Sequence, residues 1–278
     1  MNTIATIKST YKNTIDQLDL ELIIAHAINK PREFVMAHPE YKLGLFQTLK
    51  IKTYIKKREA GIPLAYIVGH KYFFGFDYKV TKHTLIPRPD TEMMVEYVIQ
   101  NIKNGDTLID IGTGSGCIPI SILKSVSDTS IKAFATDISA EALAVAKLNS
   151  KKHKVNINFR KGNLLEPFLK TGTNGSLFIT ANLPYLDESW YKESPTIQFE
   201  PKQALVAKQK GTALYKELFE QINASTISAT VLVEIDPRHV QEMKTLIETQ
   251  FPNTKYVIQN DLQNLPRLIV INIDKISK

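Results

Sequence analysis

The residues best equipped for chemistry lie in the segment Asn182-Leu183-Pro184-Tyr185, directly after the apolar run Phe178–Ala181. An asparagine side chain carries a carbonyl acceptor and an amide donor. A proline fixes its own φ and favours an extended residue before it, so nearby backbone carbonyls point in set directions. A tyrosine adds a flat ring that can stack on a planar group. These residues can therefore grip a planar –NH2 group; the alternative is a strand followed by a proline-stiffened turn.

A second candidate site is a glycine-rich loop after another apolar run; it consists of Gly112, Thr113, Gly114, Ser115 and Gly116. Glycine permits a tight turn and the close approach of a ligand to the backbone. The string Gly-x-Gly-x-Gly differs from the Gly-x-Gly-x-x-Gly of dinucleotide enzymes, and no Gly-Lys-Ser/Thr is present to cradle a nucleotide phosphate. We therefore expect a ribose-containing ligand without a pyrophosphate, of which S-adenosylmethionine is the common example.

Further residues would complete this ligand site. Asp137 ends the next predicted strand, about twenty residues past the loop, where a carboxylate can accept both ribose hydroxyls; the alternative is an acid at the start of the following helix. Asp110 precedes the loop and would hold its amides or reach the amino group of the ligand, or be purely structural. Asn163 and Leu164 follow the third predicted strand and would flank an adenine. Cys117 is expected to be a small buried residue.

The elements that position these residues form an α/β pattern. Strands are predicted at Thr107–Ile111, Ile131–Thr136, Val155–Phe159, Leu177–Ala181 and Thr230–Ile235, with helices at Cys117–Lys124 and Ala140–Asn149. Alternating strands and helices indicate a doubly wound parallel sheet with helices on both faces. The runs Tyr256–Ile258 and Leu268–Asn272 have no room for a helix between them, so we expect an antiparallel pair at the sheet edge.

The segment before this α/β pattern predicts different elements, namely short helices and a hairpin. Residues 1 to about 60 predict short helices: Leu20, Ile23, Ile24 and Ala27 fall on one face, and a basic helix runs from Leu43 to Ala60. The aromatic stretch Tyr72–Val80 with its internal glycine predicts a hairpin or a bulged strand. Pro89 and Asp90 start a helix that extends to about Lys103. We place the domain boundary between about 70 and 88.

Composition excludes several classes of protein. The 278 residues are 43% hydrophobic and 23% charged, which is an ordinary globular balance. The single cysteine excludes an internal disulfide and a multi-cysteine zinc site, and it fits a reducing compartment. No run is long enough to cross a bilayer and no signal peptide is recognisable, so we expect a soluble, cytoplasmic protein. The net charge is +7; the basic clusters Lys50–Arg58 and Lys151–Lys154 indicate solvated helix faces or, alternatively, a partner associated with RNA.

Over nearly its whole length the chain resembles the bacterial peptide chain release factor glutamine methyltransferases. The matching strings are Pro63–Gly69, Phe74–Val80, Leu85–Glu92, Asp110–Gly116, Asn182–Tyr185, Phe199–Leu205 and, near the end, Asp261-Leu with Pro266-Arg267. The resemblance implies a class I S-adenosylmethionine-dependent methyltransferase fold with a terminal antiparallel hairpin. It implies a helical substrate-recognition domain at residues 1–75, a hairpin linker to about 88 and a methyltransferase domain at 89–278.

The resemblance also implies the substrate and the roles of individual residues. The substrate is the glutamine of the Gly-Gly-Gln motif of release factors, methylated on its side-chain amide nitrogen. Asn182, Pro184 and Tyr185 would be catalytic and, with Leu183, would bind the glutamine. Residues Asp110, Gly112 to Gly116, Asp137, Asn163, Leu164 and Asn182 would bind S-adenosyl-L-methionine. Arg88 and Glu92 would orient the substrate loop or the domain junction, or form a simple salt bridge. The resemblance suggests a monomer with no metal, no membrane and no stable nucleic-acid complex.

The chain departs from the family pattern in three places. One is the region Val206–Gly211, which is less glycine-rich than usual. The family usually has Asn-Pro-Pro-Tyr, whereas Leu183 stands here in place of the first proline; the string Glu234-Ile-Asp-Pro stands where Glu-Ile-Gly is usual. Asn-Leu-Pro-Tyr also resembles the motif of ribosomal RNA adenine dimethyltransferases, so an N6-adenine methyltransferase acting on RNA or DNA is an alternative. Those proteins tend to carry a helical domain after the cofactor domain, whereas here it precedes it. A non-catalytic ribosome- or RNA-binding protein that keeps the fold is a second alternative.

Overall fold

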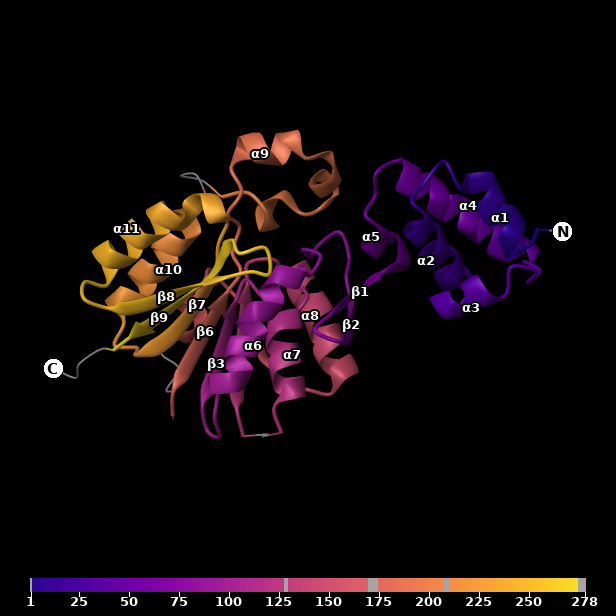
Figure 1. Ribbon diagram of the computed structural model, residues 1–278. Coiled ribbons are helices and arrows are strands. Elements are labelled where there is room, and N and C mark those ends of the chain that lie inside the picture. Colours follow the sequence, from indigo (N-terminus) through magenta and orange to yellow (C-terminus); the bar gives the residue numbers. More distant parts are fainter. Residues whose placement is uncertain (1, 128–129, 170–174, 208–210, 275–278) are drawn as a thin grey trace. The chain divides into compact units, whose positions relative to one another are not determined.

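The computed structural model describes residues 2–127, 130–169, 175–207 and 211–274 (Figure 1). The chain divides into two compact units. The first unit is Met1–His70 together with Pro195–Phe199, and the second is Lys71–Ser194 together with Glu200–Lys278.

The first unit is helical, as the sequence predicts. Its helices are α1 (Ile4–Tyr11), α2 (Gln17–Ile28), α3 (Arg32–Ala37), α4 (Leu45–Glu59) and α5 (Leu64–Val68), with the 3-10 helix η3 (Pro195–Phe199). The predicted stripe of α2 is buried at Leu20, Ile23 and Ile24, and Ala27 packs against the core as a half-buried residue. Because apolar side chains of α1 and α4 meet this stripe, the unit has a hydrophobic core of its own.

A buried carboxylate lies inside this helical unit. Glu21 on α2 accepts hydrogen bonds from Lys8 at 2.8 Å, Gln17 at 2.9 Å and Arg32 at 2.9 Å. Burial opposes ionisation of this carboxyl, but the three donors outweigh it and lower the pKa of Glu21 to about 2. The glutamate therefore joins α1, α2 and α3 as a charged, hydrogen-bonded group.

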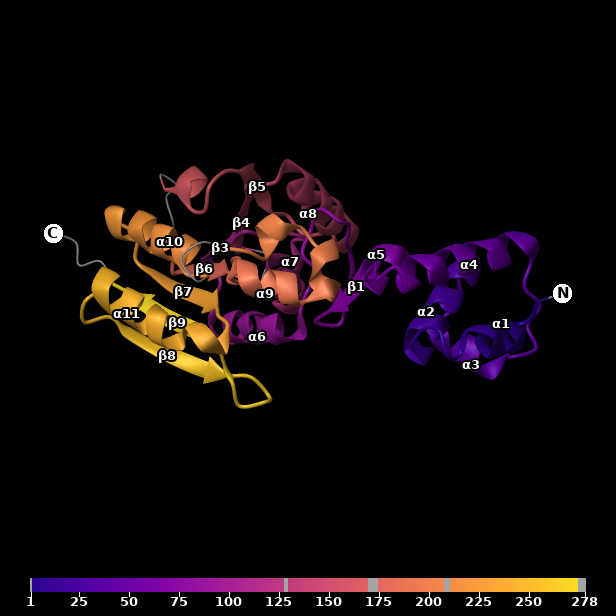
Figure 2. The ribbon, with the colours of Figure 1, turned by 90° about the horizontal axis from the view of Figure 1, so that it is seen from above.

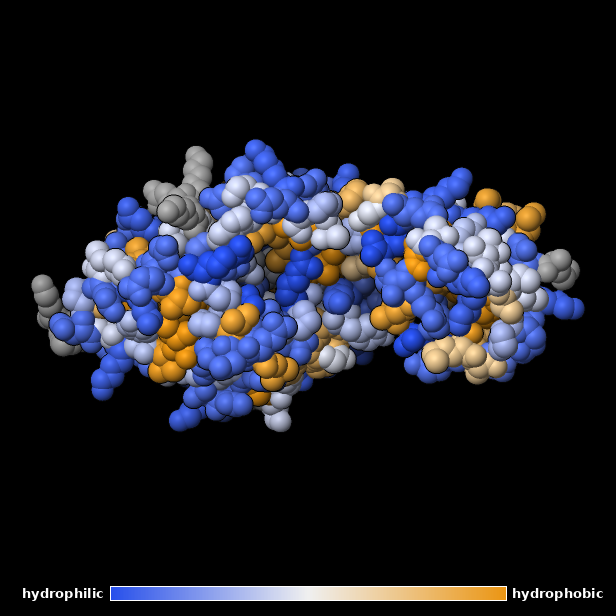
Figure 3. Space-filling model, turned by 45° about the horizontal axis from the view of Figure 1, so that its top comes forward, coloured by the Kyte–Doolittle hydropathy of each residue, from blue (hydrophilic) through white to orange (hydrophobic). Residues whose placement is uncertain are grey.

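The basic residues of α4 lie on its outer face. Lys50, Lys52, Lys56 and Lys57 are exposed, whereas Arg58 pairs with Asp19 at 2.6 Å. Figure 3 shows hydrophilic residues over much of one face of the molecule, with hydrophobic atoms emerging between them. Exposed lysines fit both alternatives given above, a solvated helix face and a surface for a partner associated with RNA, and the choice between them stays open.

The second unit is built on a seven-stranded sheet in the order β5-β4-β3-β6-β7-β9-β8. The strands are β3 (Thr107–Ile111), β4 (Lys132–Asp137), β5 (Asn158–Lys161), β6 (Leu177–Ala181), β7 (Ala229–Glu234), β8 (Lys255–Asn260) and β9 (Pro266–Ile273). Strands β3 to β7 are parallel, and β9 runs antiparallel to both β7 and β8. The predicted doubly wound sheet with a terminal antiparallel pair is confirmed. The bounds of the third strand were wrong, since it is Asn158–Lys161 and not Val155–Phe159, and the predicted helix Ala140–Asn149 and strand Tyr256–Ile258 are longer in the structure, at Ala140–His153 and Lys255–Asn260.

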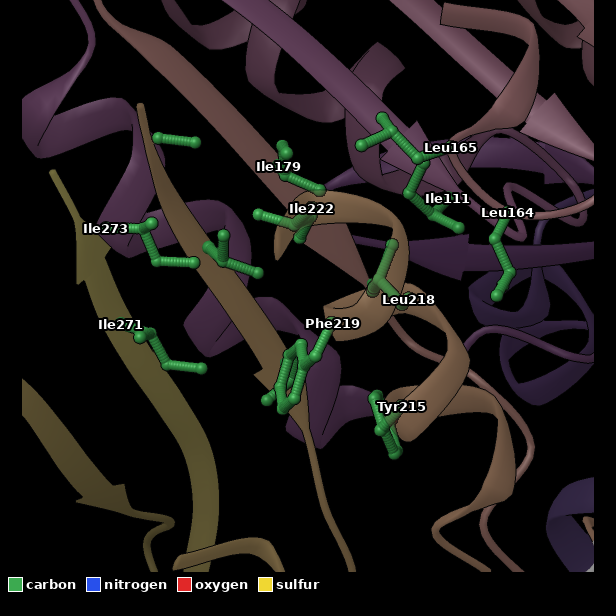
Figure 4. Packing of buried hydrophobic residues seen from close by; sticks show 14 of the residues in the cluster. Ile111, Leu164, Leu165, Ile179, Tyr215, Leu218, Phe219, Ile222, Ile271 and Ile273 are labelled. Atoms are coloured by element: carbon green, nitrogen blue, oxygen red, sulfur yellow. The ribbon is translucent and has the colours of Figure 1, made fainter. Parts of the chain in front are cut away.

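Helices cover both faces of the sheet. Helices α6 (Glu92–Asn101), α7 (Cys117–Ser125) and α8 (Ala140–His153) lie on one side, and α10 (Ala213–Ala224) and α11 (Val240–Gln250) lie on the other (Figures 1 and 2). In Figure 4, Phe219 and Ile222 of α10 point toward Ile179 of β6 and Ile271 of β9. The alternate strand residues Phe178 and Val270 join the core on the opposite face. Within the described ranges, no helix has both the length and the apolar character needed to span a bilayer.

The predicted hairpin consists of β1 (His70–Phe73) and β2 (Phe76–Lys79). Tyr78 is buried and hydrogen bonds to Ser121 of α7 at 2.6 Å. Asn149 of α8 accepts from the backbone N–H of Lys79 and donates to its carbonyl, at 2.8 and 2.9 Å. These contacts attach β2 to the helices of the sheet domain. The helix start at Pro89 is a 3-10 turn, η1 (Pro89–Thr91), which leads into α6.

Candidate functional site

The predicted site residues meet at one edge of the sheet. Because β3, β4, β6 and β7 are parallel, their carboxyl ends lie side by side, and ligands of doubly wound sheets bind at this edge. A cavity of about 620 Å³ opens there, a volume typical of a small-molecule site. Its walls include residues from the glycine loop, the end of β4 and the segments that follow β5 and β6: Gly112, Gly114, Asp137, Asn163, Leu164, Asn182, Leu183 and Pro184.

The glycine loop turns β3 into α7. Gly112 and Gly114 adopt φ values of 67° and 54° and line the cavity. Gly116 has φ 80°, and a Cβ there would lie 3.2 Å from the Cβ of Ala146 on α8, so any other residue would be strained at this position. Thr113 and Ser115, the other two residues of the loop, are buried. The loop thus presents backbone, rather than side chains, to whatever occupies the cavity.

Asp137 lies on the cavity wall and is held by two backbone groups. Its two carboxylate oxygens accept from the N–H of Gly114 and of Ser139, each at 2.9 Å. Burial raises the pKa of Asp137 above its ordinary value, and these hydrogen bonds oppose that rise. The residue therefore joins the glycine loop to the start of α8, and its assignment to the ribose hydroxyls stays a prediction.

Asp110 lies below the glycine loop and is fully buried. One carboxylate oxygen accepts from the Thr180 hydroxyl at 2.7 Å, while the other has no hydrogen-bond partner among the described residues. Burial raises the pKa of Asp110 to about 7. Since Asp110 is not part of the cavity wall, the structure gives it a place under the loop rather than within the cavity.

Asn163 and Leu164 form another part of the wall. The side-chain amide of Asn163 donates to Glu217 of α10 at 2.6 Å, and the carbonyl of Leu164 accepts from the Thr136 hydroxyl at 2.9 Å. Leu164 has φ 49°, an uncommon conformation for a branched residue. The two residues are thus fixed from both sides, by α10 and by β4.

The segment Asn182–Tyr185 leaves β6 along the cavity. Asn182, Leu183 and Pro184 line the cavity, whereas Tyr185 is half-buried next to it. The Asn182 amide donates to the Thr91 hydroxyl at 3.0 Å, and the Tyr185 hydroxyl donates to Glu234 at 3.2 Å. After the segment, the backbone of Leu186 pairs with the chain at Leu205 and Ala207, which fixes its direction.

Tyr215 on α10 supports the same segment from below. Its hydroxyl donates to the main-chain carbonyl of Glu234 and accepts from the N–H of Leu183 at 3.2 Å. Burial raises the pKa of Tyr215 well above its ordinary value, so the hydroxyl keeps its proton. The leucine that replaces the family's proline therefore uses the backbone donor that a proline lacks.

Glu234 is the last residue of β7, and no role was predicted for it from the sequence. It is buried and accepts from the Thr91 hydroxyl at 2.6 Å as well as from Tyr185. Burial raises the pKa of Glu234 from 4.5 to about 6. An acidic residue that ends an apolar strand at the carboxyl edge of a parallel sheet is the signal that could have identified it. Thr91 lies in the same string as Arg88 and Glu92, but no role was predicted for it from the sequence.

The two charged residues predicted to orient the substrate have other partners. Arg88 pairs with the buried Glu200, which also accepts from the N–H of Ile86 at 3.0 Å. Glu92 accepts from the N–H of Phe74 at 2.7 Å. Neither residue lines the cavity. For Arg88 these contacts agree with the salt-bridge alternative, and a role of either residue in substrate binding stays a prediction.

The described part of the chain contains no cluster of three His, Cys, Asp or Glu side chains arranged to hold a metal ion. Cys117 at the start of α7 is buried, and burial raises the pKa of its thiol to about 12. The thiol is therefore protonated at neutral pH and acts as a small core group.

Two family models match the chain. The PrmC N-terminal domain matches residues 8–69, and the methyltransferase small domain matches residues 89–188. The first lies within the helical unit. The second covers β3, β4, β5 and β6 with the glycine loop and the Asn182–Tyr185 segment.

Curated relatives match over nearly the full length. The chain is 30% identical over 271 residues to the release factor glutamine methyltransferase of Bacillus anthracis, covering 95% of each chain. It is 31% identical over 268 residues to the enzyme of the same name from Staphylococcus aureus, again covering 95% of each chain. Among solved structures, a methyltransferase from Pyrococcus furiosus shares the fold at 15% identity and a TM-score of 0.50, covering 80% of this chain and 96% of that one.

Proposed function

The chain belongs to the release factor glutamine methyltransferase family, and we propose that it methylates the side-chain amide nitrogen of a glutamine in a peptide chain release factor. The observation that carries the proposal is the position of Asn182 on the wall of the cavity, next to the glycine loop. The resemblance of the sequence to the family implies that the glutamine is that of the Gly-Gly-Gln motif. We further propose that the enzyme acts as a monomer in the cytoplasm.

The residues around the cavity fit S-adenosylmethionine as the cofactor. The cavity volume suits a nucleoside-sized ligand, the glycine loop offers backbone at close range, and Asp137 places a carboxylate on the wall. Gly112 and Gly114, Asp137, and the pair Asn163 and Leu164 would hold it. When bound, this cofactor supplies an electrophilic methyl group on a sulfonium.

The amide nitrogen of glutamine needs help because its lone pair is delocalised into the carbonyl. In our proposal, Asn182 Oδ1 and a main-chain carbonyl near Leu183–Pro184 each accept one hydrogen of the substrate –NH2 group. Both acceptors stabilise the positive charge that develops on nitrogen, and they orient the nitrogen toward the cofactor. The ring of Tyr185 would support the amide plane, and its face tolerates a cation. No side chain needs to act as a base, because the methylated nitrogen is acidic enough to lose a proton to water.

The test combines a substrate comparison with one variant. The enzyme is incubated with labelled S-adenosylmethionine and either a release factor or total RNA, and the products are identified by mass spectrometry. Methylation of the release factor glutamine is expected; label in RNA adenine would favour the alternative activity, and label in neither would favour a non-catalytic protein.

The variant Asn182→Ala should abolish methyl transfer and leave cofactor binding, measured by calorimetry, largely intact. The reason is that the alanine removes an acceptor for the substrate while the loop and Asp137 remain. Near-normal transfer by this variant would show that the proposed clamp is wrong.

A further inference from the structure

Residues from three elements form one chain of hydrogen bonds that ends at the cavity. Glu234 ends β7, Thr91 ends η1, and Asn182 follows β6. The Thr91 hydroxyl donates to Glu234 Oε2 at 2.6 Å, and Asn182 Nδ2 donates to Thr91 Oγ1 at 3.0 Å. Thr91 and Glu234 are only 3% and 2% exposed, so water does not compete for these bonds. We call this chain the Glu234–Thr91–Asn182 relay.

The relay has a fixed direction. An ionised carboxylate only accepts hydrogen bonds, and a threonine hydroxyl has a single proton to donate. Because that proton goes to Glu234, the Thr91 oxygen can only accept from its other neighbour. The group of Asn182 that faces Thr91 must therefore be the –NH2, and the carbonyl Oδ1 faces the opposite way.

We propose that Glu234 and Thr91 are positioning residues that hold the Asn182 amide with Oδ1 toward the substrate. This inference rests on the proposed function of Asn182. The two ends of an asparagine amide have nearly the same shape, so packing alone selects poorly between them. In the reversed orientation Asn182 would present N–H donors to the donors of the substrate –NH2 group. The relay removes that unproductive orientation.

The same carboxylate also fixes the other end of the segment. The Tyr185 hydroxyl donates to Glu234 Oε1 at 3.2 Å, so each carboxylate oxygen accepts one bond. Asn182 is therefore held through Thr91 and Tyr185 is held directly. One buried negative charge at the end of β7 orients both residues that we expect to contact the glutamine.

A pair of substitutions at Thr91 separates this role from simple packing. Thr91→Val keeps the shape and removes the hydroxyl, whereas Thr91→Ser keeps the hydroxyl and removes a methyl group. We expect Thr91→Val to lower kcat/KM for the release factor by about 10- to 100-fold, since a hydrogen bond to a charged group is lost. Thr91→Ser should stay within about threefold of the wild type. A packing role predicts the reverse order, and that result would overturn the proposal.

A second variant covers the case in which valine disturbs the fold. Glu234→Gln has nearly the same size but is neutral: its carbonyl accepts the Thr91 hydrogen bond more weakly than a carboxylate does, or its –NH2 donates to Thr91 and reverses the relay. It should lose about 10- to 100-fold in kcat/KM, while thermal unfolding shows a folded protein and calorimetry shows unchanged binding of S-adenosylmethionine. A near-wild-type rate for Glu234→Gln would contradict the relay.

The wild-type enzyme, assayed in parallel, separates this inference from the proposed function. If it does not label the release factor, the proposed substrate is wrong; if it labels RNA adenine, the same comparison of variants is made on RNA. The order of Thr91→Val and Thr91→Ser tests the relay in either case.

Discussion

Replacing Glu234 by glutamine should change how the stability of the protein depends on pH. Burial raises the pKa of Glu234 from 4.5 to about 6, so the folded protein binds a proton more tightly than the unfolded chain does. The stability from this group is fully present below pH 4.5 and is lost as the pH rises through 6. At 1.36 kcal/mol per pH unit, the loss is about 2 kcal/mol.

The groups that face Glu234 explain why the shift is not larger. Thr91 and Tyr185 donate hydrogen bonds to the carboxylate, and Arg267 on β9 favours its ionised form. Asp90 on η1 repels the ionised carboxylate and so raises the pKa of Glu234, whereas the buried Tyr215 on α10 keeps its proton and carries no charge. The partners thus offset part of the cost of burying a charge.

The measurement is the free energy of unfolding of wild type and Glu234→Gln from pH 4 to pH 8. Titrating groups other than residue 234 are common to both proteins and cancel in the difference. We expect the free energy of unfolding of the variant, taken relative to that of the wild type, to rise by about 2 kcal/mol from pH 4 to pH 7. This should appear although the variant transfers methyl groups more slowly. A difference independent of pH would refute the reasoning, because the carboxyl would then have the same pKa in both states.

Two further substitutions test the surroundings of the site and the helical unit. Leu183→Pro removes the N–H that donates to the Tyr215 hydroxyl, so the free energy of unfolding in urea should fall by about 1 kcal/mol. Methyl transfer should stay within about tenfold of the wild type, because the acceptor carbonyl remains. A larger loss of transfer would show that Leu183 has a further role. Glu21 has its pKa lowered to about 2, so its contribution to stability is present above pH 4.5 and lost as the pH falls toward 2. Glu21→Gln should therefore increase amide hydrogen exchange of α2 relative to the wild type at pH 6 and less at pH 3, and equal exchange at pH 6 would contradict this.

The strands that the sequence predicts well are buried on both faces. Leu177–Ala181 and Thr107–Ile111 are mostly apolar runs that are buried at every position, and the structure has these strands with the same bounds. The edge strand β5 is different: Asn158–Lys161 is polar and mostly exposed, so its composition carries little strand signal. The apolar residues Val155 and Ile157 just before it drew the prediction toward the N-terminus.

The candidate site was predictable where its residues follow one another in sequence. The glycine loop and Asn182–Tyr185 are local strings, and both border the cavity. The relay was not predictable, because Thr91, Asn182 and Glu234 are far apart in sequence and meet only where η1 contacts the carboxyl ends of the paired strands β6 and β7. Which neighbour satisfies a given hydrogen bond depends on tertiary packing, and a single sequence does not encode it in any short pattern.

The order of the last strands has a consequence for biosynthesis. Strand β9 follows β8 along the chain, yet it lies between β7 and β8 in the sheet. While the polypeptide emerges from the ribosome, β7 therefore keeps an open edge until residues 266–273 have been made, and β8 has no partner to join. Nascent chains that stall before this point should require chaperones, since the hydrophobic side chains beneath α11 stay unprotected until the final strand inserts.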